Sequence, residues 1–456
     1  MEPVWEVVLA DMLMAREARA ERIASALRDG HGTLVSFTMN IPGPVKVTPL
    51  ICRGFREGQR RLEHALHDAA LPFSSLFIGE VFTGCEALYT VDGSAADVKR
   101  LCISLENADG LSRLFDLDVI GTESGAVNRT ELGYAERGCM VCGAPGRGCA
   151  SRRIHSVEEL QCAAKRRLRE FFDPFDQREI MELATESLLA EVRVTPKPGL
   201  VDRSNSGSHR DMDLSLFEKS AAALLPFWGE CFAVGRDTAE EPAGETFRRL
   251  RPVGLAAERA MFAATDGINT HKGAVFLMGT LCGAVGRLRD QQSDRPTAEK
   301  LLEECRAMTR EAMEDDFVRI RKNGAKTAGE VLYLDHGLRG ARGEAADGFP
   351  SVREASLPVF RGLLAKGCER EHAAAVTLLH LIAMGTDTNL FHRGGAKGAA
   401  WAARETTRLI ENGRIPTLEE IAELDERFVG RNLSPGGCAD LLAVTLFLDR
   451  WERLEP

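Results

Sequence analysis

The spacing of apolar residues changes near residue 177, and this change limits what the 456-residue chain can fold into. Before it, short β-prone runs alternate with helical stretches, a pattern typical of a mixed α/β domain. After it, apolar residues such as Ile180, Leu183 and Leu188 recur at helical spacing, which indicates an all-α domain. The chain is also too long for one ordinary core. We therefore expect a multidomain protein, with a mixed α/β domain over 1–176 and an all-helical domain over 177–456.

Individual elements follow from the same patterns. The expected strands are 34–39, 76–78, 87–91, 101–105 and 114–120, with helices over 7–27, over 58–68 and from about Ser94. In the second part we expect helices over 271–289, 301–322, 371–384 and 438–451. Asn269 or Thr270 should cap the first of these. The joint between the domains lies at 172–176, where Pro174 should end the preceding helix.

Charge and composition exclude several classes of protein. A net charge of −10 argues against a nucleic-acid binder that relies on general electrostatics. The chain lacks a run of eighteen apolar residues, so no membrane span is expected. Its acidic first residues do not have the layout of a signal peptide. Twelve cysteines then indicate reduced thiols or metal ligands in a cytoplasmic protein. A homo-oligomer is compatible with these properties.

Two carboxylates alternate on the expected strand 114–120. Asp116 and Asp118 are two residues apart, so they point to the same face of a strand. Neighbouring carboxylates repel each other unless a cation lies between them, and Mg²⁺ prefers such ligands beside a nucleotide's phosphates. Gly110 and Arg113 lie just upstream, as in nucleotidyltransferases. The alternative is a surface strand with a polar face.

A group of cysteines follows that strand. Cys139, Cys142, Cys149 and His155 could complete a tetrahedral site for structural Zn²⁺, with intervening glycines that allow the turn. The alternative is a set of reduced structural cysteines with a solvated histidine.

A stiff Pro-Gly-Pro turn follows the first expected strand. This turn, at 42–44, would present Asn40 and Lys46 to a ligand. An ordinary turn with an exposed lysine explains it equally well.

In the second part, cations, carboxylates and amides lie on glycine-bearing turns. Such turns suit a polyphosphate, because glycines let backbone N–H groups approach it and cationic heads balance its charge. The candidate ligand-binding residues are Lys197, Gly199, Asp202, Asn205, His209, Asn269, His271, Lys272, Gly273, Arg342, Asn389, Arg393, Gly394, Gly395 and Ser434. Asp211, Glu344 and Asp387 are candidate acids or bases. Taken singly, each motif could be a solvated loop or an ordinary helix start.

The motifs together resemble a known pair of enzymes. Segments 195–202, 269–273, 342–344, 387–395 and 434–442 look like triphosphoribosyl-dephospho-CoA synthase, and this likeness spans 178–456. Segments 34–46, 113–119 and 139–155 resemble the apo-citrate lyase phosphoribosyl-dephospho-CoA transferase, over about 10–170. The chain thus resembles a fusion of two transferases that assemble the citrate lyase prosthetic group.

The resemblance implies two reactions. The synthase joins ATP to 3′-dephospho-CoA, keeps the triphosphate and releases adenine, with Asp211, Glu344 and Asp387 as candidate base and acid in unassigned roles. The transferase, a nucleotidyltransferase-like domain with metal ligands Asp116 and Asp118, then moves phosphoribosyl-dephospho-CoA to a serine of the citrate lyase acyl carrier protein (γ subunit) and releases pyrophosphate. One rival interpretation is the equivalent enzyme for malonate decarboxylase. The other is a non-catalytic nucleotide sensor, which would bind ATP without releasing adenine.

Overall fold

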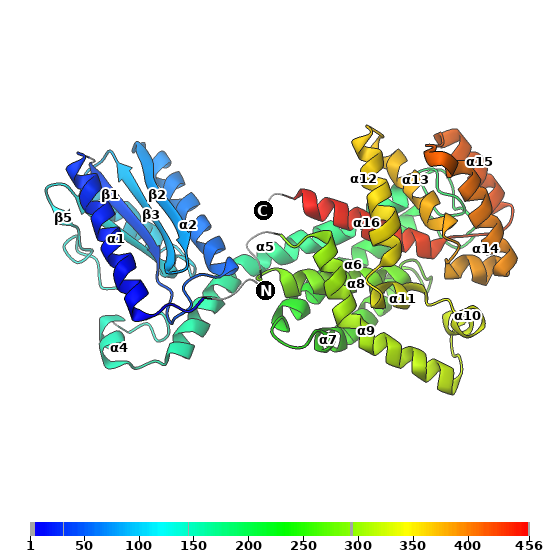
Figure 1. Ribbon diagram of the computed structural model, residues 1–456, viewed down its shortest axis with the longest axis horizontal. Helices are drawn as coiled ribbons and strands as arrows, with labels where there is room; N and C mark the ends of the chain where they lie inside the picture. Colours follow the sequence, from blue (N-terminus) through cyan, green and yellow to red (C-terminus); the bar gives the residue numbers. More distant parts are fainter. Residues whose placement is uncertain (1–4, 31, 145, 292–294, 455–456) are drawn as a thin grey trace. The chain divides into compact units, whose positions relative to one another are not determined.

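The computed structural model describes residues 5–30, 32–144, 146–291 and 295–454 (Figure 1). The chain divides into two compact units. The first takes the chain up to Phe175 together with a short stretch from Asp290, and the second takes the remainder from Asp176. This division falls one residue before the predicted boundary.

The first unit contains a five-stranded antiparallel sheet with the strand order β2-β3-β1-β4-β5. Its strands are β1 (Thr33–Met39), β2 (Phe73–Val81), β3 (Gly84–Val91), β4 (Phe115–Gly121) and β5 (Gly125–Ala126). In the pairing of β1 with β4, Ser36 lies opposite Asp118 and Thr38 lies opposite Asp116. Strand alternation then divides the side chains of β1 and β4 between two faces with different surroundings.

One face of the sheet is mostly apolar, and the other is only partly so. Val35, Phe37 and Leu117 are buried in the main core of the unit, together with residues of α2 (Pro49–Asp68) and α3 (Ala95–Glu106). On the opposite face a smaller apolar cluster forms against α1 (Leu9–Arg28), which lies along the strands in Figure 1. The polar residues of β4 share this second face. The remaining elements of the unit are η1 (Ser112–Leu114), α4 (Gly146–Arg152) and the first part of α5 (Val157–Arg193).

Two sequence-based expectations for this unit are wrong. Residues 101–105 belong to α3, not to a strand. Ser94 caps that helix, and Val98 and Cys102 bury a helical face, so burial at helical spacing overrides the β-propensity of the run. Pro174 does not end a helix either, because α5 continues through it. A proline costs a helix one backbone hydrogen bond. Apolar residues on both sides of it, such as Phe172 and Ile180, are buried and keep the helix formed.

The second unit is helical throughout its described residues, as predicted. Its elements after α5 are α6 (Leu214–Asp237), α7 (Ala243–Ala264), α8 (Lys272–Leu288), α9 (Ala298–Asn323), α10 (Ala328–His336), α11 (Gly340–Ala346), η2 (Ser351–Ser356), α12 (Leu357–Ala365), α13 (Arg370–Ala383), α14 (Thr388–Ile410), η3 (Glu411–Gly413), α15 (Leu418–Val429) and α16 (Gly436–Arg453). The predicted helices over 271–289, 301–322, 371–384 and 438–451 are confirmed as α8, α9, α13 and α16.

Helix α16 is buried on two sides. Its residues Val444, Phe447 and Trp451 belong to a core with α6 to α9, whereas Leu442 and Leu446 belong to a second core with α13 to α15. A helix that is apolar on opposite faces must lie inside the molecule. Its N-terminus therefore lies where the two cores meet.

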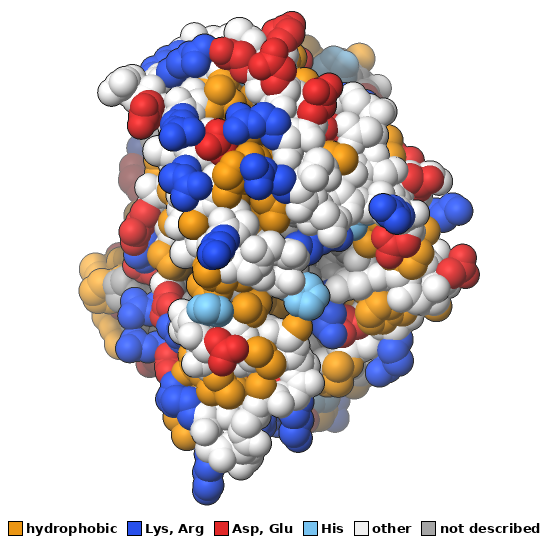
Figure 2. All heavy atoms as spheres, turned by 90° about the vertical axis from the view of Figure 1, so that its right-hand side faces the viewer, with side chains coloured by type: hydrophobic (Ala, Val, Ile, Leu, Met, Phe, Trp, Pro, Cys, Tyr) orange, Lys and Arg blue, Asp and Glu red, His pale blue; other side chains and the backbone are white. Residues whose placement is uncertain are grey.

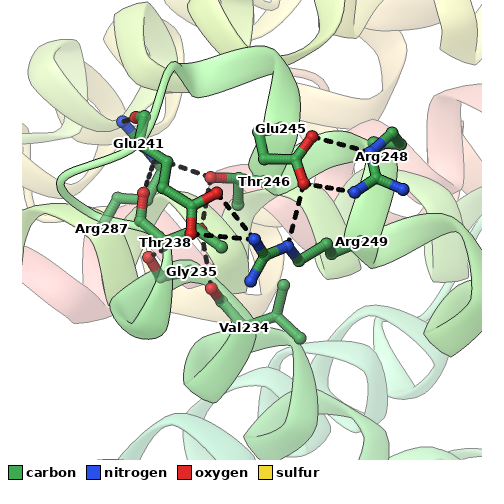
Figure 3. Close-up of polar contacts among 9 residues, drawn as sticks. All are labelled: Val234, Gly235, Thr238, Glu241, Glu245, Thr246, Arg248, Arg249 and Arg287. Carbon is green, nitrogen blue, oxygen red and sulfur yellow. Dashed lines mark hydrogen bonds and ion pairs between the residues drawn. The ribbon is translucent and has the colours of Figure 1, made fainter.

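A buried arginine fixes the far end of α8 (Figure 3). Arg287 donates to the carbonyl of Thr238 (2.5 Å), to the hydroxyl of Thr246 (2.6 Å) and to the carbonyl of Glu241 (3.1 Å). The Glu241 carboxylate also pairs with Arg249 (2.7 Å) at the rim of this network. These bonds join the last turn of α8 to the end of α6 and the start of α7. Among the described helices, none is long and apolar enough to cross a membrane.

Candidate active sites

The second unit contains a cavity of about 770 Å³ at the starts of α8, α14 and α16. Figure 2 shows the molecule from the right-hand side of Figure 1, where histidine and basic side chains border a recess in the surface. The predicted site residues that line the cavity are Lys197, His209, Asp211, Asn269, His271, Lys272, Gly273, Glu344, Asp387, Asn389, Arg393 and Ser434. Folding thus brings together residues from all the sequence motifs of the second half.

Three helix N-termini face this cavity. Its lining includes Lys272 and Gly273 of α8, Thr388 of α14, and Gly436 and Gly437 of α16. The N-terminal end of a helix carries unpaired N–H groups and a partial positive charge, so it favours an anion. With Lys272 and Arg393 beside them, these ends make an environment suited to a polyphosphate.

Two buried carboxylates fasten the three helices to one another. Asp387 caps α14 by accepting from the N–H groups of Asn389 (2.7 Å) and Leu390 (2.9 Å), and it also accepts from Cys438 in α16 (2.7 Å). Asp440 of α16 accepts from the N–H of Ala274 in α8. Burial raises the pKa of Asp387, although these N–H donors oppose the shift. Asp387 is therefore a clamp between helices, and its assignment as catalytic stays a prediction.

Lys197 is held by an internal partner. It is 1% exposed, and its Nζ lies 2.6 Å from Oε1 of Glu191, which is also buried. The same ammonium donates to the Glu191 carbonyl (3.0 Å). Burial raises the pKa of Glu191, and the nearby ammonium lowers it. The pair forms part of the cavity wall, so Lys197 lies near the predicted ligand while neutralising a buried carboxylate.

A neutral histidine links the loop before α6 to α14. Nδ1 of His209 lies 3.0 Å from the Arg393 guanidinium, and its Nε2 lies 2.9 Å from Oγ of Ser434. A guanidinium can only donate, so Nδ1 accepts and the proton is on Nε2, which donates to Ser434. Burial and the Arg393 charge lower the pKa of His209 to about 4. Arg393 also donates to the carbonyl of Ser208 (2.8 Å), so its guanidinium has a fixed orientation.

His271 is buried and neutral in the same way. Its Nδ1 lies 2.7 Å from Oγ of Ser220, while its Nε2 is buried without a hydrogen-bond partner. Burial and the charge of Lys197 lower the pKa of His271 to about 3. His271 itself occupies the N-cap position of α8, so the predicted cap at Asn269 or Thr270 is wrong by one or two residues. Asn269 still accepts from the N–H of Lys272 (3.2 Å), which explains why the local sequence suggested a cap.

The other two candidate acids differ in exposure. Glu344 of α11 accepts from the hydroxyl of Ser351 (2.5 Å) and from its N–H (3.3 Å). Burial raises the pKa of Glu344, and these bonds to Ser351 lower it. Asp211 is exposed at the cavity rim. A half-buried and an exposed carboxyl group in one cavity are candidates for an acid and a base.

The remaining predicted residues lie behind the cavity or beside it. Asp202 accepts from the N–H groups of Lys197 (3.1 Å), Ser204 (2.6 Å) and Asn205 (3.0 Å), and so shapes the loop that carries Lys197. Gly199 has φ +72°, and a Cβ there would meet the Leu433 carbonyl oxygen at 2.0 Å, so only glycine fits. The predicted residues that do not line the cavity are Gly199, Asp202, Asn205, Arg342, Gly394 and Gly395.

Sequence reasoning missed five charged residues of the cavity wall: Glu191, Arg339, Asp347, Glu354 and Asp440. Asp440 could have been found, because it lies four residues after Gly436 and thus on the same side of the first turns of α16. A Cβ on Gly273 would lie 2.0 Å from Oδ2 of Asp440, so the glycine is needed for the carboxylate to reach α8. Glu191 lies near the end of a long helix without any motif around it.

In the first unit, Asp116 and Asp118 share one face of β4, as predicted. The buried residues of this strand alternate with them, and Asp118 is exposed while Asp116 is half-buried. Desolvation and the neighbouring Asp116 carboxylate raise the pKa of Asp118. A third carboxylate, Glu86 of β3, lies opposite Thr38 of β1 and so on the same face. Sequence reasoning did not find Glu86, because its strand neighbours are known only from the register.

Arginines of α1 cover this acidic face. Arg19 pairs with Glu86 (2.7 Å), Arg22 contacts the same carboxylate, and the charges of Asp116 and Asp118 act on Arg19. The acidic face is therefore partly neutralised by α1.

The other candidates of the first unit make contacts within the local fold, and their roles in binding stay predictions. Arg113 donates to the carbonyl of Gly138. Lys46 is half-buried and donates to the carbonyl of Ile41 (2.6 Å), and burial lowers its pKa. Asn40 donates its backbone N–H to the Leu114 carbonyl (2.7 Å), which keeps its loop beside the start of β4.

The four candidate zinc ligands converge in space. One ligand atom from each of Cys139, Cys142, Cys149 and His155 lies within 4.8 Å of the others. Sγ of Cys142 is 3.5 Å from Sγ of Cys149, and Nε2 of His155 is buried without a hydrogen-bond partner. The donor set and its spacing are those of a closed four-ligand zinc site.

Comparisons with known proteins divide the chain in the same way. Residues 177–456 match the family model for ATP:dephospho-CoA triphosphoribosyl transferase (CitG), and residues 7–171 match the model for apo-citrate lyase phosphoribosyl-dephospho-CoA transferase (CitX). The chain is 34% identical to Protein CitXG of Haemophilus influenzae over 97% of its own length and 96% of that protein. It is 44% identical to a probable 2-(5″-triphosphoribosyl)-3′-dephosphocoenzyme-A synthase of Citrobacter koseri, over 58% of this chain and 88% of the relative. A synthase of the same description from Haemophilus ducreyi is 38% identical over 67% of this chain and 98% of its own length.

Proposed function

The chain belongs to the ATP:dephospho-CoA triphosphoribosyl transferase family through its second part and to the CitX family through its first, and from this we propose how its two units work. The protein is a transferase that assembles the citrate lyase prosthetic group. Its second unit makes 2′-(5″-triphosphoribosyl)-3′-dephospho-CoA from ATP and 3′-dephospho-CoA and releases adenine. Its first unit transfers phosphoribosyl-dephospho-CoA to a serine of the citrate lyase acyl carrier protein and releases pyrophosphate.

The observation that carries the synthase assignment is the cavity where three helices begin. The triphosphate of ATP has to be gripped without being cleaved, and helix N-termini with Lys272 and Arg393 beside them suit that task. Arg393 is held in place by His209 and Ser208, so little further ordering is needed when it binds.

The synthase reaction needs two proton transfers, and two carboxyl groups of the cavity, exposed Asp211 and half-buried Glu344, can carry them out. The 2′-hydroxyl of dephospho-CoA attacks C1′ of the ATP ribose, the bond from C1′ to adenine breaks, and the ring passes through an oxocarbenium-like state. We assign the base that accepts the hydroxyl proton to exposed Asp211. Glu344, whose pKa is raised by burial, is the acid that protonates the departing adenine.

The transferase site lies on the acidic face of the first unit's sheet, which we propose is a nucleotidyltransferase-like fold. Asp116 and Asp118 fit Mg²⁺, because they are adjacent carboxylates on one face and Asp118 is open to solvent. When bound there, Mg²⁺ would neutralise charge on the phosphates. The carrier serine oxygen attacks the α-phosphorus, and the bond from that phosphorus to the β-phosphate oxygen breaks. Arg19 lies close enough to the two carboxylates to hold the nucleotide beside them.

The protein as a whole can be tested by mass spectrometry. We expect incubation with ATP and dephospho-CoA to yield free adenine and the triphosphoribosyl product. Addition of apo citrate lyase acyl carrier protein should then give a carrier that is heavier by phosphoribosyl-dephospho-CoA. A nucleotide sensor would bind ATP without forming adenine. An enzyme for malonate decarboxylase would modify that carrier and leave the citrate lyase carrier unchanged.

We further propose that Cys139, Cys142, Cys149 and His155 bind structural Zn²⁺. The unpartnered buried Nε2 of His155 supports this, because a buried ring nitrogen normally has a partner. A closed set of four ligands leaves no open position, so the ion would serve the fold. None of the twelve cysteines, all of which are described, forms a disulfide, which suits a reducing compartment such as the cytoplasm.

Removal of one thiol should release the metal. We expect about one zinc per chain in the natural protein by elemental analysis, and Cys142→Ser should lose it because three ligands hold the ion far more weakly. The first unit should then melt at a lower temperature, while adenine release continues. Cys162→Ser is the matched control, since Cys162 is exposed on α5 outside the cluster. Full zinc content in Cys142→Ser, or metal-free natural protein that transfers normally, would contradict the site.

A further inference from the structure

Three arginines, Arg113, Arg129 and Arg137, lie near one another, and one of them approaches Asp116. Arg137 donates to the backbone carbonyl of Arg113 (2.9 Å), and Arg113 donates to the carbonyl of Gly138. Nη1 of Arg137 lies 3.5 Å from Oδ1 of Asp116. Arg129 and Arg137 both approach Glu106, at 3.9 Å and 3.6 Å. Their side chains are only 15% and 20% exposed, so these guanidinium groups are held in place.

In the described part of the chain, the carboxylates seen to approach Arg129 and Arg137 are Glu106 and Asp116, at 3.5 to 3.9 Å. Buried Glu106 accepts from the N–H of Leu117 (3.0 Å), and its distances to Arg129 and Arg137 are long for charged hydrogen bonds. The Nε atoms of Arg129 and Arg137 are buried without a hydrogen-bond partner. Arg167 of α5 has the same unpartnered Nε.

Arg167 belongs to the same group of charges. Burial lowers the pKa of Arg113, and the charges of Arg137, Arg167 and Arg129 lower it further, whereas Glu106 raises it. Like charges held near one another are costly unless an anion lies among them. We call Arg113, Arg129, Arg137 and Arg167 the arginine cluster.

We propose that the arginine cluster is a pyrophosphate site, which binds the β- and γ-phosphates of the triphosphoribosyl substrate and then the pyrophosphate released. The inference rests on the proposed transferase function and adds its leaving-group site. Guanidinium groups suit this ligand because each can donate two parallel hydrogen bonds to phosphate oxygens. The contact from Arg137 to Asp116 places the cluster next to the carboxylates that we assign to Mg²⁺.

The cluster acts on the charge that develops during transfer. When the serine oxygen bonds to the α-phosphorus, the electron pair of the breaking bond passes to the β-phosphate oxygen. The serine proton leaves to solvent or to a neighbouring base. Fixed arginines around the β- and γ-phosphates stabilise that negative charge without having to move.

Pyrophosphate binding tests the cluster directly. Inorganic pyrophosphate is titrated calorimetrically into the full-length protein with Mg²⁺, and its inhibition constant for carrier modification is measured with preformed triphosphoribosyl-dephospho-CoA. The variants are Arg129→Gln and Arg167→Gln, with Arg129→Lys to keep the charge. Arg166→Gln is the control, because Arg166 is 62% exposed next to Arg167 on α5. Melting curves show whether each variant is folded.

We expect Arg129→Gln and Arg167→Gln each to weaken pyrophosphate inhibition by about tenfold, in line with the loss of one charged phosphate contact. Arg129→Lys should weaken pyrophosphate inhibition less than Arg129→Gln does. Arg166→Gln should bind pyrophosphate as the natural protein does. Adenine release should be unchanged in all four. Equal inhibition constants in folded Arg129→Gln and the natural protein would overturn the inference while carrier modification stands. Weakened calorimetric binding in a protein that modifies no carrier would instead reject the transferase function and keep the anion site.

Discussion

Asp116→Asn should lower transfer to the citrate lyase carrier by about a thousandfold, because the loss of a carboxylate that holds the metal removes several kcal/mol of transition-state stabilisation. Asparagine keeps the shape of the side chain but not its charge. Because Asp116 lies on a strand of the first unit, adenine release by the second unit should not change. The measurement is the rate of carrier mass gain, beside the rate of adenine formation in the same sample.

Asp118→Asn should behave in the same way, since both carboxylates share one face of β4. Asp68→Asn is a matched control: Asp68 is an 84% exposed carboxylate at the end of α2. If folded Asp116→Asn protein transferred at the natural rate, the metal assignment would be wrong. Equal loss of both activities in folded protein would show that the two reactions depend on one site.

Lys197→Met should destabilise the second unit by about 3 to 5 kcal/mol, because it leaves a buried carboxylate without its partner. Lys197 and Glu191 are both nearly inaccessible to solvent and only 2.6 Å apart. Burial already raises the pKa of Glu191, and loss of the ammonium would raise it further. Such a carboxyl stabilises the fold when protonated and costs stability as pH rises through its folded pKa. The deficit, measured by urea unfolding, should therefore be larger at pH 8 than at pH 5.

Lys219→Met controls for the loss of a lysine, since Lys219 is exposed on neighbouring α6. The double variant Lys197→Met with Glu191→Leu should recover much of the stability, because no unpaired charge is then left in the interior. An unchanged unfolding midpoint in Lys197→Met would show that Glu191 is protonated in the natural protein and does not need the lysine.

The fold could be predicted where burial follows a simple period. Helices of the second unit bury apolar residues at helical spacing, and strand β4 alternates strictly, so both were visible in the sequence. The prediction of a strand over 101–105 was wrong because β-prone residues also fit the buried face of helix α3. The prediction that Pro174 ends a helix was wrong. Local steric repulsion disfavours a helix at a proline, but the burial of apolar residues on either side of it outweighs that cost.

The candidate sites were predictable where residues lie on glycine turns. Lys272 and Arg393 were predicted from such motifs and the Asp116 pair from the alternation of its strand, and their roles stay predictions. The sequence did not predict Glu191, Glu86 or Arg137 as site residues. Each of them reaches its site through pairing or packing with residues more than five positions away in the chain. Asp387 was found, but its three N–H donors could not be foreseen, since one of them belongs to α16.

If zinc binds as proposed, the cysteine cluster ties one of the two reactions to the supply of a trace metal. Cys139 follows directly on Arg137 and Gly138, and the Arg137 carbonyl accepts from the N–H of Gly146 within the same turn (3.0 Å). Under the zinc proposal, the turn that presents the leaving-group arginine keeps its shape only while the ion is bound. A cell short of zinc would thus continue to consume ATP and dephospho-CoA and would accumulate the triphosphoribosyl intermediate. Its citrate lyase would meanwhile stay in the inactive apo form, so zinc limitation would halt citrate cleavage one step after the nucleotide has been spent.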